Sequence, residues 1–177
     1  LHRVSLELGG NDALIILEDA EMDLAIHESF CGRHVHAGQI CCASKRFMVQ
    51  NSIREEFTNQ LLEKIKAIQV GDPNDENTTF GPVTSEKAAI DIERQIQHSV
   101  EQGARLLFGG KRFNRTFIEP TLLTDVTPDM DIARDMEIFG PVWPIIGFDT
   151  IEEAIEIANN SIYGLSGGVM TRDQGKT

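Results

Sequence analysis

GGNDALIILEDAEM, residues 9–22, carries the best strand signal in the chain. The run ALIIL at 13–17 is short, unbroken and apolar, which is typical of a strand buried on both faces of a parallel sheet. A helix is expected to follow over 22–36, because Asp19 can cap a segment in which apolar residues recur at four-residue spacing. Gly38 ends that pattern.

Strand and helix signals alternate along the rest of the chain. Further strands are expected at 47–49, 105–108 and 168–170. Further helices are expected at 53–68, 89–100 and 150–159, the last with a capping box formed by Thr150 and Glu153. This alternation predicts an α/β fold, with an open, mostly parallel twisted sheet and helices on both faces. Functional residues in such sheets usually lie at the carboxyl ends of the strands.

One long connection interrupts the alternation. GDPNDENTTFGPVTS, residues 71–85, is dense in Gly, Pro, Asn and Asp, the residues that favour turns. It is therefore expected to run over the surface and to take no part in the core.

Composition limits the possible classes of protein. A chain of 177 residues can bury roughly 70% of its unfolded surface as one domain. Hydrophobic residues at 41% and charged residues at 25% are typical of a globular protein. The 16 basic and 28 acidic residues give a formal net charge of −12, which repels nucleic acid and anionic membrane surfaces. Neither is expected as a partner.

Three features of the sequence bear on the cellular location of the protein and on its full length. No apolar run approaches the ~18 residues that would cross a bilayer, and the start LHRVSLELGG lacks the apolar region of a signal peptide. Three cysteines make no disulfide framework, so a reducing, cytoplasmic location is expected. The chain does not begin with Met, which suggests a piece of a longer protein.

Cys41 and Cys42 stand side by side in HAGQICCASKRF, residues 36–47, in or near a loop. A nucleophilic thiol needs an exposed position and a pKa lowered by cations or backbone N–H groups, and Lys45 and Arg46 could supply such help. Free cysteines are among the most buried residue types, so the residues alone leave open whether either thiol is reactive. A strained vicinal disulfide acting as a redox switch is a further alternative.

Two acidic residues beside glycines are also candidates. Glu7 lies in LELGGND, where burial would raise its carboxyl pKa toward the value that a general base needs; a solvated glutamate beside a turn explains the same pattern. Glu137 and Phe139 begin EIFGPVWP, where they could bind ligand hydroxyls and lie against a flat ring. A strand entry after a Gly-Pro turn is the simpler explanation of that segment.

A metal site is not expected. Cys31, His34 and His36 are the candidate ligands, but residues two apart on a helix do not share a face. His34 and His36 should therefore diverge and leave a tetrahedral site without enough ligands.

These segments, in this order, resemble a known family. LELGG at 6–10, AGQIC at 37–41 and EIFGPV at 137–142 are similar to the signature segments of the NAD(P)-dependent aldehyde dehydrogenase superfamily. The connecting segments resemble the same family: GDP at 71–73, FGPV at 80–83, EPTLL at 119–123 and NNSIYGLSGGV at 159–169. The resemblance covers essentially the whole chain.

The resemblance implies a role for each candidate residue. Cys41 would be the nucleophile that forms a thiohemiacetal and then a thioester, and its backbone N–H would supply half of an oxyanion hole. Cys42 would pack behind it. Glu7 would be the general base that activates water for hydrolysis of the thioester.

The cofactor implied is NAD or NADP. Glu137 would hold the hydroxyls of the nicotinamide ribose and Phe139 would contact the nicotinamide side. The backbone of Leu8 and Gly9 would border the nicotinamide.

The resemblance also implies that residues 1–177 are the thiol-bearing catalytic domain of a longer enzyme. The N-terminal dinucleotide-binding domain, a second oxyanion donor and the C-terminal end would lie outside the chain, so the isolated chain should be inactive. The full-length enzyme is expected to be a homodimer or homotetramer. The wording of HAGQICCASKRF and LELGGND is most similar to bacterial succinate semialdehyde dehydrogenases, and a fold retained for binding without activity is the alternative.

Overall fold

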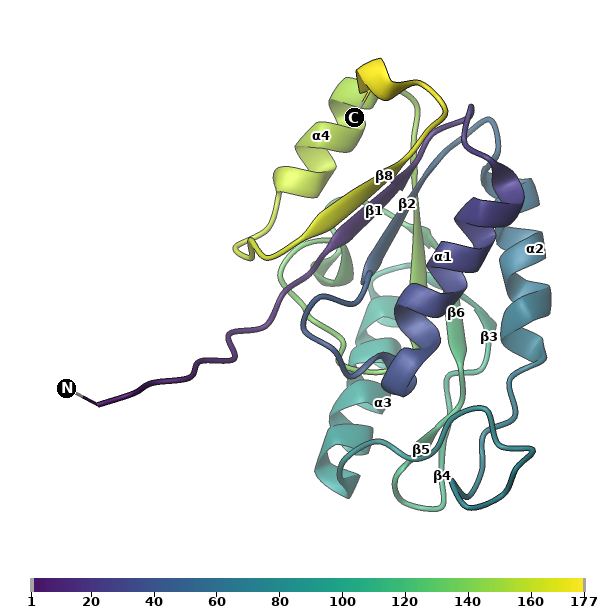
Figure 1. Ribbon diagram of the computed structural model, residues 1–177, viewed down its shortest axis with the longest axis vertical. Helices are drawn as coiled ribbons and strands as arrows, with labels where there is room; N and C mark the ends of the chain where they lie inside the picture. The colour runs from purple at the N-terminus through teal and green to yellow at the C-terminus, as the bar shows by residue number, and fades with distance from the viewer. Residues whose placement is uncertain (1, 177) are drawn as a thin grey trace.

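The computed structural model describes residues 2–176, which build a six-stranded sheet in the order β3-β6-β7-β2-β1-β8 (Figure 1). Every neighbouring pair is parallel except β3 and β6. The strands are β1 Ala13–Ile16, β2 Arg46–Gln50, β3 Arg105–Phe108, β6 Thr121–Val126, β7 Val142–Phe148 and β8 Gly167–Met170. A separate two-residue pair joins β4 Arg112–Phe113 to β5 Phe117–Ile118. The predicted open, mostly parallel sheet is confirmed.

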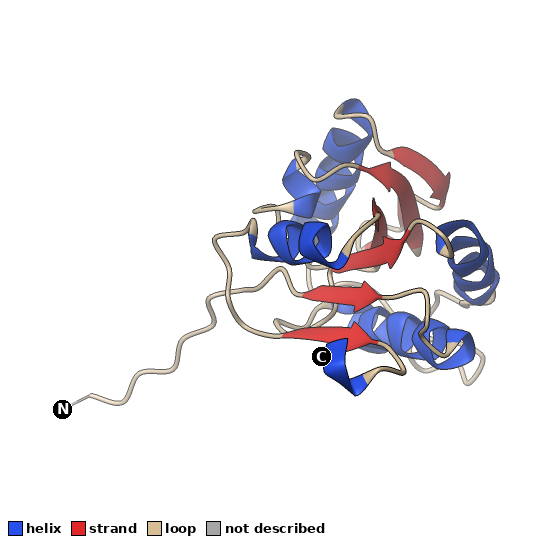
Figure 2. Cartoon of the chain, turned by 90° about the horizontal axis from the view of Figure 1, so that it is seen from above, coloured by secondary structure: helices blue, strands red, loops and turns tan. Residues whose placement is uncertain are grey.

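Helices cover both faces of the sheet, as the alternating pattern predicts (Figure 2). They are α1 Met22–His34, α2 Arg54–Lys66, α3 Glu86–Glu101 and α4 Ile151–Asn159. Short 3₁₀ turns occur at Val35–Gly38, Asp131–Ala133 and Gln174–Lys176. Within the described residues no helix is long and apolar enough to cross a membrane.

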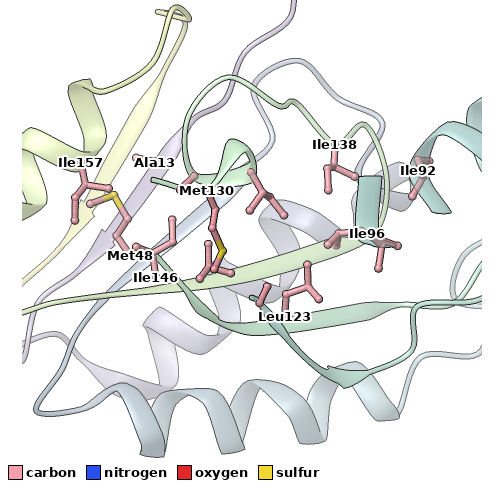
Figure 3. Packing of buried hydrophobic residues seen from close by; sticks show 14 of the residues in the cluster. Ala13, Met48, Ile92, Ile96, Leu123, Met130, Ile138, Ile146 and Ile157 are labelled. Carbon is pink, nitrogen blue, oxygen red and sulfur yellow. The ribbon is translucent and has the colours of Figure 1, made fainter. Parts of the chain in front are cut away.

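The core consists of two layers, one on each face of the sheet. In the first, Ile92 and Ile96 of α3 and Ile157 of α4 pack with Met48 and Ile146 of the central strands (Figure 3). In the second, α1 and α2 pack on the opposite face against side chains that include Trp143. Alternate residues of β1 point into different layers: Ala13 into the first, Leu14 and Ile16 into the second. The run at 13–17 is apolar throughout because both faces of its strand are covered.

Helix ends depend on local caps. α1 is capped by Glu21, whose Oε2 accepts a hydrogen bond from Leu24 N at 2.8 Å, so the expectation for Asp19 is wrong. Asp19 instead accepts hydrogen bonds from the Thr171 hydroxyl beyond β8. At α4 one half of the expected capping box is present, because Thr150 Oγ1 accepts from Glu153 N at 3.2 Å; the Glu153 carboxylate accepts from Asp149 N at 2.7 Å instead of from Thr150 N.

The connection between α2 and α3 differs from the expectation in one respect. Phe80 and Val83 are 7% and 4% exposed, and Val83 belongs to the layer under α3. Phe80 also forms an isolated parallel bridge with Val70. The polar composition of 71–85 correctly indicates a surface connection, but these two apolar side chains are buried, because Val83 packs in the layer under α3 and the Phe80 ring lies against His34 with centroids 5.5 Å apart.

Candidate functional site

The candidate residues converge at the amino ends of three neighbouring strands. Glu7 to Gly10 precede β1, Cys41 precedes β2, and Glu137 and Phe139 precede β7, while β1, β2 and β7 lie side by side in the sheet. The expectation that functional residues lie at the carboxyl ends of strands is wrong for this set. These residues lie on segments that lead into strands, such as the link from α1 into β2. They therefore gather at the amino ends of the strands, opposite the carboxyl ends.

Cys41 occupies a tight turn between α1 and β2. Ala43 N donates a hydrogen bond to Ile40 O at 3.2 Å, which makes Cys41 and Cys42 the two central residues of the turn. Cys41 is half-buried and Cys42 is exposed. The expectation that Cys42 packs behind Cys41 is therefore wrong, because the turn directs Ala43, only 4% exposed, into the protein instead.

The surroundings of the Cys41 thiol shift its pKa in opposite directions. Removal from water raises its pKa most strongly, and the neighbouring Glu7 carboxylate raises it further through its charge and a hydrogen bond. A hydrogen bond from the backbone of Cys42 lowers the pKa. The net direction is upward, so the thiol is predominantly protonated at neutral pH and needs a base to become a thiolate. Glu7 is within reach to be that base.

Glu7 lies on an irregular arm, residues 2–10, that extends away from the sheet (Figure 1). Of the two alternatives for Glu7, a buried acid and a solvated glutamate, the structure shows the second: the residue is exposed, as are its apolar neighbours Leu6 and Leu8 at 68% and 77%. The arm makes no strand contact that would cover these side chains within the described part of the chain. The carboxylate nevertheless lies against the Cys41 thiol.

Gly9 forms a close contact with Glu137. Its φ of +77° lies in the left-handed region that favours glycine, and a Cβ at this position would lie 2.3 Å from Glu137 Oε2. The next residue, Gly10, donates its N–H to Glu137 Oε1 at 3.2 Å. Any side chain at position 9 would displace the carboxylate, so the glycine pair places Glu137 beside the start of β1.

The surface around Glu137 suits the ribose and the ring of a nicotinamide nucleotide. Glu137 is a carboxylate acceptor with a 17% exposed side chain, the Gly9 backbone lies close against it, and the Phe139 ring, two residues from Glu137, is 41% exposed. Ribose hydroxyls are donors that a carboxylate binds well, and a flat ring packs on an aromatic face. The residues present therefore fit the group that the sequence implies.

Lys45 and Arg46 have different roles in the structure. Lys45 Nζ donates to the carbonyls of Ile40 at 3.0 Å and Cys41 at 2.6 Å, and forms an ion pair with Glu137 Oε1 at 3.2 Å. Burial lowers the pKa of Lys45, as does the charge of Arg33, while Glu137 raises it.

Arg46 points away from the thiol turn, so its expected help to a thiolate is not observed. Its guanidinium donates to four backbone carbonyls, those of Asn11, Ala133, Ile157 and Ala158. Arg46 thereby ties β2 to the segment before β1, to the 3₁₀ turn before β7 and to the last turn of α4.

Arg33 is a residue that the sequence reasoning missed. It is 1% exposed, and it donates to Val142 O at 2.9 Å, to Gly38 O at 3.5 Å and to Ile138 O. Burial lowers its pKa to about 9, against the opposing charge of Glu137, which leaves it positively charged at neutral pH. Its burial could have been predicted from its position, because it follows Phe30 by three residues and so falls on the apolar stripe of α1.

Gly38 brings the thiol loop against the Glu137 segment. It follows two left-handed residues, His36 and Ala37, both with φ of 54°, and has φ of +73° itself. These conformations end α1 two residues earlier than expected. A Cβ on Gly38 would lie 2.3 Å from Gly140 O. The close approach of the two backbones requires glycine here.

Gly38→Ala in the full-length protein is expected to reduce the free energy of unfolding by about 2 kcal/mol or more, because it adds a left-handed penalty and a backbone clash. Chemical denaturation measures the change. Gly164→Ala is the matched control, since a Cβ there meets nothing within 4 Å, and it should stay within about 0.5 kcal/mol. Equal losses in the two variants would contradict the close-contact explanation.

The histidines near the thiol diverge as expected. His34 stacks on Phe30 with ring centroids 4.8 Å apart, and burial lowers its pKa, whereas His36 is exposed. No group of three or more metal-ligating side chains occurs among residues 2–176. All three cysteines are free.

The chain is similar to many proteins of one family. The model of the aldehyde dehydrogenase family matches residues 1–177. The chain is 40% identical over 174 residues to lactaldehyde dehydrogenase of Methanococcus aeolicus, covering 98% of this chain and 37% of that protein. It is 38% identical over 176 residues to succinate semialdehyde dehydrogenase [NAD(P)+] Sad of Escherichia coli, covering 98% and 38%.

A solved structure agrees with these matches. Betaine aldehyde dehydrogenase of Staphylococcus aureus, crystallised with NAD+, superposes with a TM-score of 0.91 at 41% identity over 96% of this chain and 35% of that one. The chain thus spans little more than a third of the length of the relatives that it matches. On this evidence the chain belongs to the aldehyde dehydrogenase family.

Proposed function

We propose that this chain is the thiol-bearing catalytic domain of an NAD(P)-dependent aldehyde dehydrogenase, which oxidises an aldehyde to the carboxylic acid. The observation that carries the proposal is that the Glu7 carboxylate acts on the Cys41 thiol, through its charge and a side-chain hydrogen bond, near the amino ends of β1, β2 and β7, where Glu137 also lies. A nucleophile, a base and a ribose-binding carboxylate together describe one oxidation site. The dinucleotide-binding domain would lie upstream of residue 1, in the length that the relatives have and this chain does not.

This chain supplies the base, the nucleophile and one oxyanion donor of the proposed reaction. Glu7 takes the thiol proton, and the Cys41 sulfur attacks the aldehyde carbon to form a thiohemiacetal. The negative charge that develops on the aldehyde oxygen is stabilised by the backbone N–H of Cys41. A bound nicotinamide nucleotide supplies the acceptor for the hydride that leaves that carbon.

Hydrolysis completes the cycle. The oxidised carbon remains on Cys41 as a thioester. Glu7 releases the thiol proton to solvent and, again ionised, removes a proton from a water molecule that attacks the carbonyl. The carbon–sulfur bond breaks, the acid leaves, and Cys41 recovers its proton. An acid at the position of Glu7 favours release of the free acid over transfer to coenzyme A.

The cofactor would be NAD or NADP. Glu137 would bind the ribose hydroxyls, Phe139 would lie against the nicotinamide side, and the Leu8–Gly9 backbone would border the ring. The close approach of the Gly9 backbone to the Glu137 carboxylate supports this assignment, because it places the two cofactor-binding segments side by side.

Succinate semialdehyde is the substrate that we propose to test first. The segments HAGQICCASKRF and LELGGND resemble the enzymes that oxidise it, and Sad of Escherichia coli carries that name. Its carboxylate needs a cation, and the three cations of the thiol region, Arg33, Lys45 and Arg46, are buried on backbone carbonyls. We therefore propose that the cation that binds this carboxylate lies on the upstream part of the enzyme.

The full-length protein is expected to form NADH or NADPH from an aldehyde. The test measures absorbance of the reduced nucleotide with NAD and with NADP, across succinate semialdehyde, lactaldehyde, benzaldehyde and betaine aldehyde. Preference for succinate semialdehyde would support the substrate proposal. A folded protein that reduces neither nucleotide with any of them would contradict the enzyme proposal and favour a binding or structural role.

Two further properties remain proposals. We expect the full-length enzyme to work in the cytoplasm, because its thiol must stay reduced, and to form a homodimer or homotetramer. The partners expected are the aldehyde and the nucleotide, with no nucleic acid or membrane, in agreement with the acidic net charge of −12.

A further inference from the structure

Lys45 is an unusual residue for its position, because its ammonium group is buried beside the reactive turn. The side chain is 1% exposed, and Nζ donates to three backbone carbonyls of the turn: Ile40 at 3.0 Å, Cys41 at 2.6 Å and Ala43 at 3.4 Å. A buried cation is costly unless it is paired and hydrogen-bonded. Here the carbonyls and Glu137 together provide those partners.

Two of these carbonyls belong to the peptide units that flank the Cys41 side chain. A trans peptide is planar, and its C=O and N–H point in opposite directions. The Ile40 carbonyl shares its peptide plane with the N–H of Cys41, so Lys45 fixes the direction of that N–H and points it away from the buried ammonium. This N–H is the proposed oxyanion donor.

The second peptide plane, between Cys41 and Cys42, carries the N–H donor that lies beside the Cys41 sulfur. The Cys41 carbonyl shares its peptide with the N–H of Cys42, and the Cys42 backbone forms the hydrogen bond that favours the Cys41 thiolate. Lys45 Nζ holds this carbonyl at 2.6 Å, its shortest contact. One ammonium group therefore controls both backbone donors around the nucleophile.

The Lys45 ammonium also has a partner outside the turn, the carboxylate of Glu137. Glu137 Oε1 lies 3.2 Å from Nζ and also accepts from Gly10 N at 3.2 Å. Arg33 and Asp12 are the other charged groups that face Lys45, with opposite effects on its charge. The turn, the start of β1 and the Glu137 segment meet at this nitrogen.

We propose that Lys45 is a positioning residue, whose ammonium orients the Cys41 N–H toward the substrate oxygen and the Cys42 N–H toward the Cys41 sulfur. The inference rests on the proposed function for the first role, since an oxyanion forms only during aldehyde oxidation. The second role is independent of activity and can be measured in protein without nucleotide.

Lys45→Met in the full-length protein removes the ammonium and keeps a stem of similar length. The pH profile of Cys41 alkylation by iodoacetamide, followed by peptide mapping without nucleotide, is expected to shift upward by roughly one pH unit, because the thiolate loses an oriented donor. Glu7 and the Cys42 thiol, the titratable groups beside Cys41, remain in both proteins, so they do not account for the difference. The kcat for aldehyde oxidation should fall by roughly 10²-fold, the usual effect of one oxyanion donor, with a smaller change in the aldehyde KM.

Lys45→Gln is the second variant, because its amide can still donate to a carbonyl if Met is not tolerated. It should give a smaller shift in the same direction. Lys66→Met, which removes an exposed lysine of α2, is the matched control and should leave both profile and kcat unchanged. A folded Lys45→Gln or Lys45→Met protein with the alkylation profile of the wild type would overturn the proposal. Wild-type protein that oxidises no aldehyde would instead contradict the proposed function, while the alkylation profiles would still test Lys45.

Discussion

Full-length protein carrying Cys41→Ser is expected to lose aldehyde-dependent NAD(P)H formation by at least about 10⁴-fold. A serine hydroxyl has a much higher pKa than a thiol, and Glu7 alone cannot generate a useful concentration of alkoxide at neutral pH. The turn geometry should survive, because the substitution changes one atom on a half-buried side chain. Steady-state absorbance of the reduced nucleotide measures the loss, and circular dichroism verifies the fold.

Cys42→Ser is the matched control for this experiment. Its side chain is exposed at the next position of the same turn, so activity should stay within about threefold of the wild type. An active Cys41→Ser protein, or an inactive Cys42→Ser protein that still folds, would show that the wrong thiol has been assigned.

Glu7→Gln is expected to separate formation of the thioester from its hydrolysis. The first turnover should still release about one reduced nucleotide per site, but more slowly than in the wild type, because the thiol loses its base while loss of the Glu7 charge lowers the Cys41 pKa and lets some thiolate form without it. The steady-state rate should then fall by roughly 10²- to 10⁴-fold because water is no longer activated. Stopped-flow absorbance records both phases. Burst and steady-state rates equal to the wild type would contradict the assignment of Glu7 as the base.

The same variant has a second readout with a defined sign. The Glu7 charge raises the pKa of the Cys41 thiol, so its removal should lower that pKa and move the alkylation profile to lower pH. Glu18→Gln, an exposed acid after β1, should leave the profile where it is. A profile that moves upward in Glu7→Gln would mean that the carboxylate does not lie against the thiol.

The fold could be predicted from local patterns because its main constraint is local. An unbroken apolar run at 13–17 requires cover on both faces, and alternating strands and helices leave a doubly covered parallel sheet as the simplest solution. The antiparallel pairing of β3 with β6 was not predicted, because no strand was expected at 121–126 and the direction of pairing depends on the β4–β5 connection between the two strands. The burial of Phe80 likewise depends on a distant contact, with the ring of His34.

The site was harder to predict because its contacts join distant segments. Cys41 and Glu7 were identified through resemblance, but which way each thiol points depends on a turn closed by Ala43, which the residue types do not reveal. Arg33 donates to carbonyls more than 100 positions away, at Ile138 and Val142. No local pattern contains such pairings, although a cation on the apolar stripe of a helix indicates that a buried partner exists.

The thioester on Cys41 is the central claim, and trapping it is the most direct measurement. Full-length Glu7→Gln protein is mixed with aldehyde and nucleotide, quenched in acid during the burst, digested and examined by peptide mass spectrometry. The expected result is the acyl mass on Cys41, with Cys42 of the same peptide unmodified. An acyl group on Cys42, or a burst of reduced nucleotide with no acylated cysteine, would contradict the account.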